Sequence, residues 1–193
     1  MKYYKIISGE ENSQENEIVC FSEENYESKY HLKENDIYKG KCFENWDRNF
    51  TFYYEKSEGY VSKDYLANNL AWPIISSKFK RILDDIGVPE VQYLPINIEE
   101  KYTGKKLEGF TVVNIITLLD ALDLENSVYT EFKARGKKML SIKKYALQQE
   151  KVRGYNFVRL KKSKYSTFIS EIVRNKLVEN KITGCDFLEI SVV

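Results

Sequence analysis

The residues able to carry out chemistry are few in this chain, and their spacing matches no catalytic motif. His31 is the single histidine and lies in an acidic stretch, so we expect a solvated surface side chain rather than a catalytic base. Cys20, Cys42 and Cys185 are scattered without a CxxC spacing, which argues against a disulfide framework and against a zinc site. We expect all three to be small buried apolar side chains. The chain also lacks glycine-rich phosphate-binding and HExxH motifs, so we expect no catalytic residue, metal or cofactor.

Asp120 and Asp123 form the one local carboxylate pair in an apolar setting, within the segment LLDALDLENS. On a helix their spacing would place both on one side, where they could bind a cation or shift the pKa of one another. Alternatively, Asp120, Asp123 and Ser127 cap backbone N–H groups at a corner between a strand and a turn. We favour capping, and a hydrolase that uses two carboxylates stays as an alternative.

A helix is predicted over about residues 76–86. Apolar residues recur at i, i+3, i+4 and i+7 from Phe79 onward, which gives the helix one apolar face. Ser76 or Ser77 can cap its start, because a serine hydroxyl accepts a hydrogen bond from the first free N–H groups. Gly87 suits a left-handed residue at its end, and Pro89 prevents it from continuing.

A related segment returns near the end of the chain at a constant offset of 94 residues. The identical pairs are Ile75/Ile169, Ser76/Ser170, Leu83/Leu177, Leu94/Leu188 and Ile96/Ile190. This match predicts a second helix over about 169–180, with the apolar stripe Ile169, Ile172, Val173 and Leu177, followed by a strand over 185–190. We interpret the two segments as a duplicated helix–strand unit in which each helix covers one part of a mixed sheet.

The remaining chain favours strands. Fifteen tyrosines, ten phenylalanines and two tryptophans are a large aromatic share, and aromatic residues are enriched in sheets. Further strands are predicted at residues 3–8, 18–21, 37–43, 50–56, 91–96, 110–116 and 156–160. Residues 63–72 are ambiguous between a helical turn and a loop. The predicted fold is therefore α+β, with mixed, largely antiparallel sheets and two main amphipathic helices.

Length and hydropathy point to one cytoplasmic domain. At 193 residues we expect a single domain over 1–193, with a possible β-rich subdomain at 1–63 and a core at 64–193. The N-terminus lacks the apolar run of a signal peptide. The longest apolar stretch, residues 110–124, is interrupted by polar side chains and is too short to span a bilayer.

Charge is unevenly distributed although the net charge is only +1. Residues 8–36 hold nine acidic residues against two lysines, and residues 133–164 hold twelve basic residues against one glutamate. These two charged segments either steer a charged partner, are each solvated separately, or face each other in the fold.

The basic segment also suggests contact with nucleic acid, because its lysines and arginines alternate with Tyr145, Tyr155 and Phe157. No RNA-binding, zinc-finger or recognition-helix signature accompanies them, which argues against that function.

Four blocks of the chain occur in a characteristic order: DYLANNLAWPIISSKFKRILDDIGV, VVNIITLLDALDLENS, NFVRLKKS and ISEIVRNKLVENKITGCDFLEI. Over about residues 64–190 the chain resembles a bacterial immunity-protein family of polymorphic toxin systems, long catalogued as a domain of unknown function. The positions that match its motifs are Ser76, Asp120, Asp123, Ser127 and Gly184, and we interpret them as residues that maintain the fold.

The resemblance implies a cytoplasmic protein that binds a cognate toxin and blocks it, without catalysis or a cofactor. If the toxin has a basic cleft, the acidic stretch is the expected contact surface, through Glu23, Glu24, Tyr26, Glu27 and Tyr30. If the toxin surface is acidic, residues 133–164 become the candidate instead.

Overall fold

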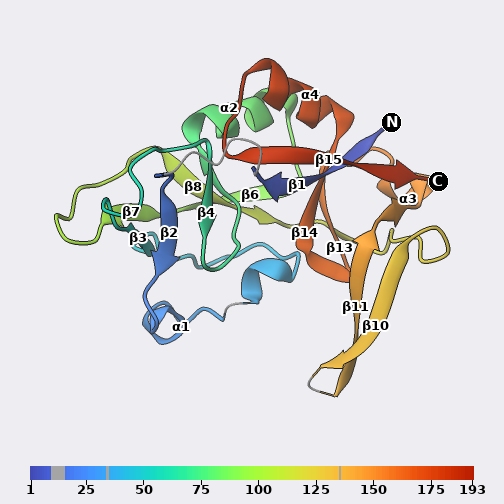
Figure 1. Ribbon diagram of the computed structural model, residues 1–193, viewed down its shortest axis with the longest axis horizontal. Helices are drawn as coiled ribbons and strands as arrows, with labels where there is room; N and C mark the ends of the chain where they lie inside the picture. Colours follow the sequence, from blue (N-terminus) through green and yellow to red (C-terminus); the bar gives the residue numbers. More distant parts are fainter. Residues whose placement is uncertain (10–15, 34, 135) are drawn as a thin grey trace.

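The computed structural model describes residues 1–9, 16–33, 35–134 and 136–193. Within these ranges the chain is rich in strands and has few helices (Figure 1). Four α-helices and one 3-10 helix are described: α1 (Tyr26–Lys29), α2 (Ser77–Ile86), α3 (Gln149–Val152), α4 (Glu171–Glu179) and η1 (Asp36–Tyr38). None of the described helices is long and apolar enough to cross a membrane.

One sheet of six strands has the order β12–β15–β1–β14–β13–β9. Its strands are β1 (Tyr3–Ser8), β9 (Leu118–Leu119), β12 (Ala146–Leu147), β13 (Phe157–Leu160), β14 (Ser163–Ser170) and β15 (Cys185–Val192). The pairs β12–β15 and β13–β9 are parallel and the others are antiparallel, so this sheet is mixed. The first strand of the chain therefore lies among strands from its last third.

A second sheet of seven strands has the order β6–β8–β5–β4–β2–β3–β7. Its strands are β2 (Val19–Ser22), β3 (Thr51–Tyr54), β4 (Tyr65–Asn68), β5 (Ile74–Ser76), β6 (Val91–Pro95), β7 (Asn97–Glu100) and β8 (Phe110–Ile115). The remaining two strands, β10 (Val128–Ala134) and β11 (Lys137–Lys144), pair with each other as an antiparallel hairpin.

The two segments related by 94 residues adopt the same helix geometry. Ser76 caps α2 by accepting a hydrogen bond from the Phe79 N–H, and Ser170 caps α4 by accepting one from the Val173 N–H. α2 ends at Gly87, which has φ 71°, whereas α4 has its C-cap at Asn180 with φ −87°, and the counterpart of Gly87, Lys181 at φ 53°, follows one residue later. The helix predicted over 76–86 is thus confirmed, and the start and end signals of the second unit lie where the offset places them.

The sheet around each helix is also arranged alike. β8 lies between β5 and β6 and is antiparallel to both, and β1 lies between β14 and β15 in the same manner. Val112 of β8 is opposite Ile74 and Leu94, whereas Lys5 of β1 is opposite Phe168 and Leu188, which are the same two positions shifted by 94. Helices α2 and α4 pack side by side over the two sheets (Figure 1).

The second helix is shorter than predicted. Ile169 belongs to strand β14, and Ile172 is 47% exposed, so neither contributes to a buried helical stripe. Val173 and Leu177 are the buried residues of α4. The polar residue Lys176 stands where α2 has Ile82, which leaves α4 with a narrower apolar face.

Three further expectations were wrong. Residues 37–43 form part of η1 and a loop rather than a strand, because Ile37 and Tyr38 are buried by packing against distant segments and Gly40 turns the chain at φ 65°. Residues 65–68 form strand β4, through pairing with β2 and β5. Cys42 is exposed, whereas Cys20 and Cys185 are buried as expected.

The core consists of three apolar clusters. One lies between the helices and both sheets and includes Ile75 and Phe79 from the first unit with Ile169 and Val173 from the second. A second cluster is rich in aromatic rings and lies under β2, β3 and β4. The third lies between the six-stranded sheet and the base of the hairpin.

Candidate functional site

The acidic residues singled out from the sequence follow strand β2 and lead into α1. Ser22, the last residue of β2, is held by a 3.0 Å hydrogen bond from its N–H to the Asn69 side-chain oxygen. Glu23 and Glu24 come next, and the chain then turns into the single helical turn of α1. In this connection Glu23 is half-buried and Glu24 is exposed.

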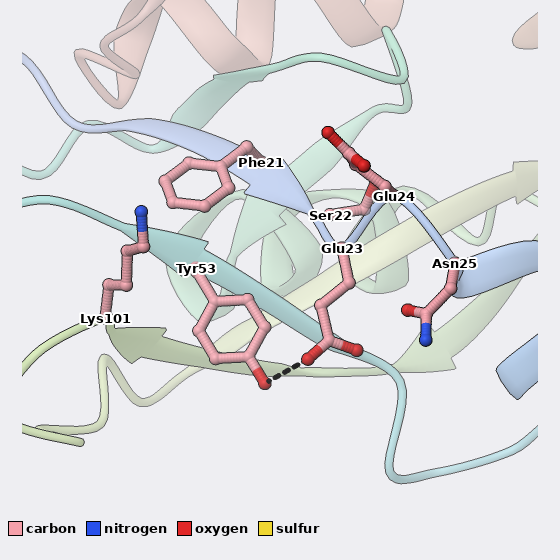
Figure 2. A pocket seen from close by; sticks show the side chains of 7 residues that line it. All are labelled: Phe21, Ser22, Glu23, Glu24, Asn25, Tyr53 and Lys101. Atoms are coloured by element: carbon pink, nitrogen blue, oxygen red, sulfur yellow. Dashed lines mark hydrogen bonds between the residues drawn. The ribbon is translucent and has the colours of Figure 1, made fainter.

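The carboxylates border an open hollow of about 760 Å³ (Figure 2). We call it the Glu23 hollow; its lining residues are Phe21, Ser22, Glu23, Glu24, Asn25, Tyr53 and Lys101. Phe21 and Tyr53 are opposite each other on β2 and β3, and their rings lie 6.3 Å apart. Together the two rings form an aromatic wall beside the carboxylates.

Two contacts hold the Glu23 side chain. Its Oε2 forms an ion pair with Lys29 Nζ at 2.7 Å, and its Oε1 accepts a hydrogen bond from the Tyr53 hydroxyl at 3.4 Å. Figure 2 shows the Glu23 carboxylate meeting the Tyr53 hydroxyl while the Glu24 side chain points away from both. The side chains of Glu24 and Glu27 are exposed to solvent.

Electrostatic effects in the hollow follow from these contacts. The hydrogen bond to Glu23 raises the pKa of Lys29, which stays charged at neutral pH. Burial is the first cause and the Glu23 charge the second cause of the raised pKa of Tyr53, whose hydroxyl stays protonated and donates a hydrogen bond to Glu23. Lys101 pairs with Glu55 at 2.7 Å and lies 5.4 Å from the centre of the Phe21 ring. The aromatic wall is therefore already in contact with one cation.

Tyr26 and Tyr30, which were predicted as contact residues, pack against the aromatic core next to the acidic loop. Tyr26 is only 8% exposed and packs edge-on against Phe50 and Trp72. The Tyr30 ring lies 4.6 Å from Phe50, and its hydroxyl donates to the Asn49 carbonyl at 3.1 Å. Tyr26 thus supports the acidic loop and offers almost no surface to a partner.

Sequence patterns did not identify Phe21, Tyr53 or Lys101 as part of the hollow. In strand β3 the buried residues Phe52 and Tyr54 alternate with the half-buried Thr51 and Tyr53, which places Tyr53 on the other face of the strand. Nothing local indicated that β3 pairs with both β2 and β7, and this pairing brings three distant segments together.

Two of the family-motif positions, Ser76 and Gly184, lie where the unit around α2 meets the unit around α4. Asp64 accepts a 2.7 Å hydrogen bond from the Ser76 hydroxyl with one oxygen and a 3.1 Å hydrogen bond from the Thr183 N–H with the other. Gly184 follows at φ 86°, and a Cβ there would lie 2.2 Å from the Tyr65 carbonyl oxygen. The backbone at Gly184 therefore touches strand β4 directly.

The Asp120–Ser127 corner is held by backbone contacts. The Asn126 side-chain amide donates to Asp123 Oδ2 at 2.9 Å, and the N–H groups of Asn126 and Glu125 donate to Oδ1 at 3.1 and 2.9 Å. These hydrogen bonds, first of all the one from the Asn126 side chain, lower the pKa of Asp123. Ser127 donates to the Asp123 carbonyl and accepts from the Ala146 N–H at 3.0 Å. Asp120 is exposed. The contacts of Asp123 are those of a cap.

The basic segment does not form one continuous surface. Arg159 is 1% exposed and lies 4.6 Å over the Tyr38 ring, with its Nη1 donating to the Ile37 carbonyl at 2.7 Å. Tyr145 and Phe157 are buried, so neither can stack on a base. The lysines at 133 and 138 lie on the hairpin, and those at 161–164 lie at the turn between β13 and β14.

The two charged ends of the sequence do not neutralise each other at the residues whose ion pairs are described. Glu23 pairs with Lys29, and Asp36 pairs with Lys39 at 2.6 Å. Both lysines lie close in sequence to their acidic partners and outside the basic segment. Across the described residues, no group of three His, Cys, Asp or Glu side chains is placed to hold a metal ion. His31 is exposed.

Comparison with curated proteins gave no significant match. The model of one protein family, described as an immunity protein family (Imm11), matches residues 2–192. This match includes the N-terminal third, which the four sequence blocks left out, and covers nearly the whole chain. The chain therefore belongs to the immunity protein family Imm11.

Proposed function

We propose that this protein is an immunity protein that binds a cognate bacterial toxin in the cytoplasm and neutralises it by covering its active surface. Family membership over residues 2–192 carries the proposal. Inhibition by occlusion requires a stable, complementary surface, and it makes and breaks no covalent bond. We propose the Glu23 hollow as this surface.

The hollow suits a basic side chain of the toxin. Glu24 supplies an exposed carboxylate, and the aromatic wall of Phe21 and Tyr53 can receive a cation on its face, as it already receives Lys101. A stable interface buries about 1,200–2,000 Å² in total and is anchored by a few aromatic or arginine residues. We therefore extend the proposed contact to Glu27 and to Tyr102, which is 71% exposed and donates to Glu55 at 3.3 Å.

The test is protection of cells that express a candidate toxin, to be sought in the coding region next to this gene. The variant Glu23→Lys/Glu24→Lys/Glu27→Lys should lose protection, with affinity reduced about 10- to 100-fold because reversed charges repel a basic cleft. A matched control, Asp85→Lys/Glu150→Lys/Glu179→Lys, changes the net charge equally and also breaks one surface ion pair, Lys176–Glu179 at 2.8 Å. It should protect as the wild type does.

Two results would contradict the proposal. If the wild-type protein neither binds the toxin nor restores growth, the function itself is wrong. If the Glu23 triple variant protects fully, the acidic surface is not the contact site and the basic segment replaces it as the candidate.

We further propose that the two units around α2 and α4 arose from one duplicated helix–strand segment. The shared caps, the positive φ at the counterparts Gly87 and Lys181 and the equal sheet register support this origin. The division of the chain into an N-terminal subdomain at 1–63 and a core at 64–193 stays a prediction.

A further inference from the structure

The β10–β11 hairpin projects from the body of the protein as an arm (Figure 1). In the described residues its strands pair only with each other. Most of its side chains are exposed on both faces, including Phe132 at 44% and Met139 at 39%. An isolated two-stranded hairpin is only marginally stable in water. The arm is held at its base, where Leu140 and Ile142 pack against the third core cluster, and its outer part is left uncovered.

A groove of about 600 Å³ runs between the arm and the turn that joins β13 to β14. We call it the arm groove; its lining residues are Leu124, Glu131, Lys138, Met139, Leu140, Lys161, Lys162, Ser163, Lys164 and Tyr165. It is built by a different part of the chain from the Glu23 hollow, and the two share no lining residue.

The rim of the arm groove is strongly positive. Four lysines line it against one acidic residue, Glu131, which is already occupied by Lys138 at 3.5 Å. Lys161, Lys162 and Lys164 have no ion pair with any acidic residue that the structure describes. Three neighbouring cations repel one another, and an acidic ligand would relieve that repulsion.

The floor of the groove is apolar and fixed in place. Tyr165 is 61% exposed, yet its ring packs edge-on against Tyr38 at 4.7 Å and its hydroxyl donates to the Asn35 side chain at 2.9 Å. Leu124, Met139 and Leu140 supply aliphatic surface beside it. A ligand would therefore meet an aromatic ring that is already held in place, which lowers the entropic cost of binding to it.

We propose that the arm groove binds an extended segment of a partner protein in which acidic residues alternate with apolar ones. The acidic side chains would meet the lysines of the rim, the apolar ones the floor, and the peptide backbone the unpaired edge of β11. The identification of the partner as the toxin rests on the proposed function, but the chemistry of the groove does not. Nucleic acid fits less well, because single strands are held by stacking on several aromatic rings and Tyr165 is the only ring in the lining.

The test uses fluorescence anisotropy with a labelled dodecapeptide of alternating Glu and Leu. The wild-type protein should bind it at low ionic strength, and the affinity should fall as salt is added because salt screens exposed charges. Lys161→Gln/Lys162→Gln/Lys164→Gln should weaken binding at least about tenfold. Met139→Ser should weaken it by roughly fivefold without changing the salt dependence, because it removes apolar contact only.

Controls separate the groove from charge in general. Lys41→Gln/Lys105→Gln/Lys106→Gln removes three exposed lysines elsewhere and should leave binding within about twofold of wild type. Far-ultraviolet circular dichroism checks that each variant is folded. Absence of peptide binding, equal losses in the two lysine triples, or tighter binding of a twelve-nucleotide thymidine strand would each overturn the proposal. None of these results depends on whether the toxin assay succeeds.

Discussion

Replacing Gly184 by alanine tests whether this turn joins the two units through direct backbone contact. Gly184 has φ 86°, and an added Cβ would lie 2.2 Å from the Tyr65 carbonyl oxygen and 2.8 Å from the Lys63 Cβ. Since non-bonded carbon and oxygen atoms keep about 3.2 Å apart, strand β4 would have to move by about 1 Å. The Tyr65 carbonyl belongs to the backbone of a strand that is hydrogen-bonded to its neighbours, so moving it costs free energy.

The expected loss of stability has two parts. A left-handed alanine costs about 1 kcal/mol relative to glycine. Moving β4 also weakens the 3.0 Å hydrogen bond from the Tyr65 N–H to the Thr183 carbonyl. It weakens as well the two hydrogen bonds that the backbone N–H groups of Asp64 and Thr183 donate to each other's side chains. Each hydrogen bond contributes roughly 1 kcal/mol net. The free energy of unfolding should therefore fall by about 3–4 kcal/mol, and Tm by about 10 °C.

Gly104→Ala is the matched control. Gly104 has φ 68°, and an added Cβ would meet nothing within 4 Å, so the control carries the backbone strain without the collision. It should cost only about 1 kcal/mol. Urea unfolding followed by tyrosine and tryptophan fluorescence measures both variants. Equal losses in the two variants would refute the reasoning, because they would show that β4 does not resist the added methyl group.

Three further predictions concern the caps, the thiols and a buried hydroxyl. Ser76→Ala and Ser170→Ala should each lower the free energy of unfolding by about 1 kcal/mol, measured by urea denaturation, since each hydroxyl caps a helix; a loss in only one would deny their equivalence. In the folded protein only Cys42 should react rapidly with Ellman's reagent, because burial raises the pKa of the other two thiols to about 12, and rapid reaction of all three would contradict this burial. Burial also raises the pKa of Tyr3 to about 12, so the folded chain keeps a proton that the unfolded chain releases near pH 10. The stability advantage of wild type over Tyr3→Phe should thus be full below about pH 10 and shrink as the pH rises toward 12, and a constant difference in urea unfolding would contradict this.

Patterns within short segments predicted much of the fold. The first helix, with its cap at Ser76 and its end at Gly87, lies where its periodicity placed it. The offset of 94 residues located the second cap at Ser170 as well. Both results depend on hydrogen bonds between residues three to five positions apart, and such bonds are determined by the local sequence. The motif at Asp123 was interpretable for the same reason.

The surfaces proposed for binding could not be predicted in this way. The Glu23 hollow exists because β3 pairs with β2 on one side and β7 on the other, which brings Phe21, Tyr53 and Lys101 together across some 80 residues of chain. The basic segment likewise turned out to be divided, with Arg159 buried and Lys161–Lys164 facing an arm groove. Sequence alone determined which residue types were available and where local turns of helix begin and end. Strand order and register, which depend on packing between distant segments, decided which of those residues meet at a surface.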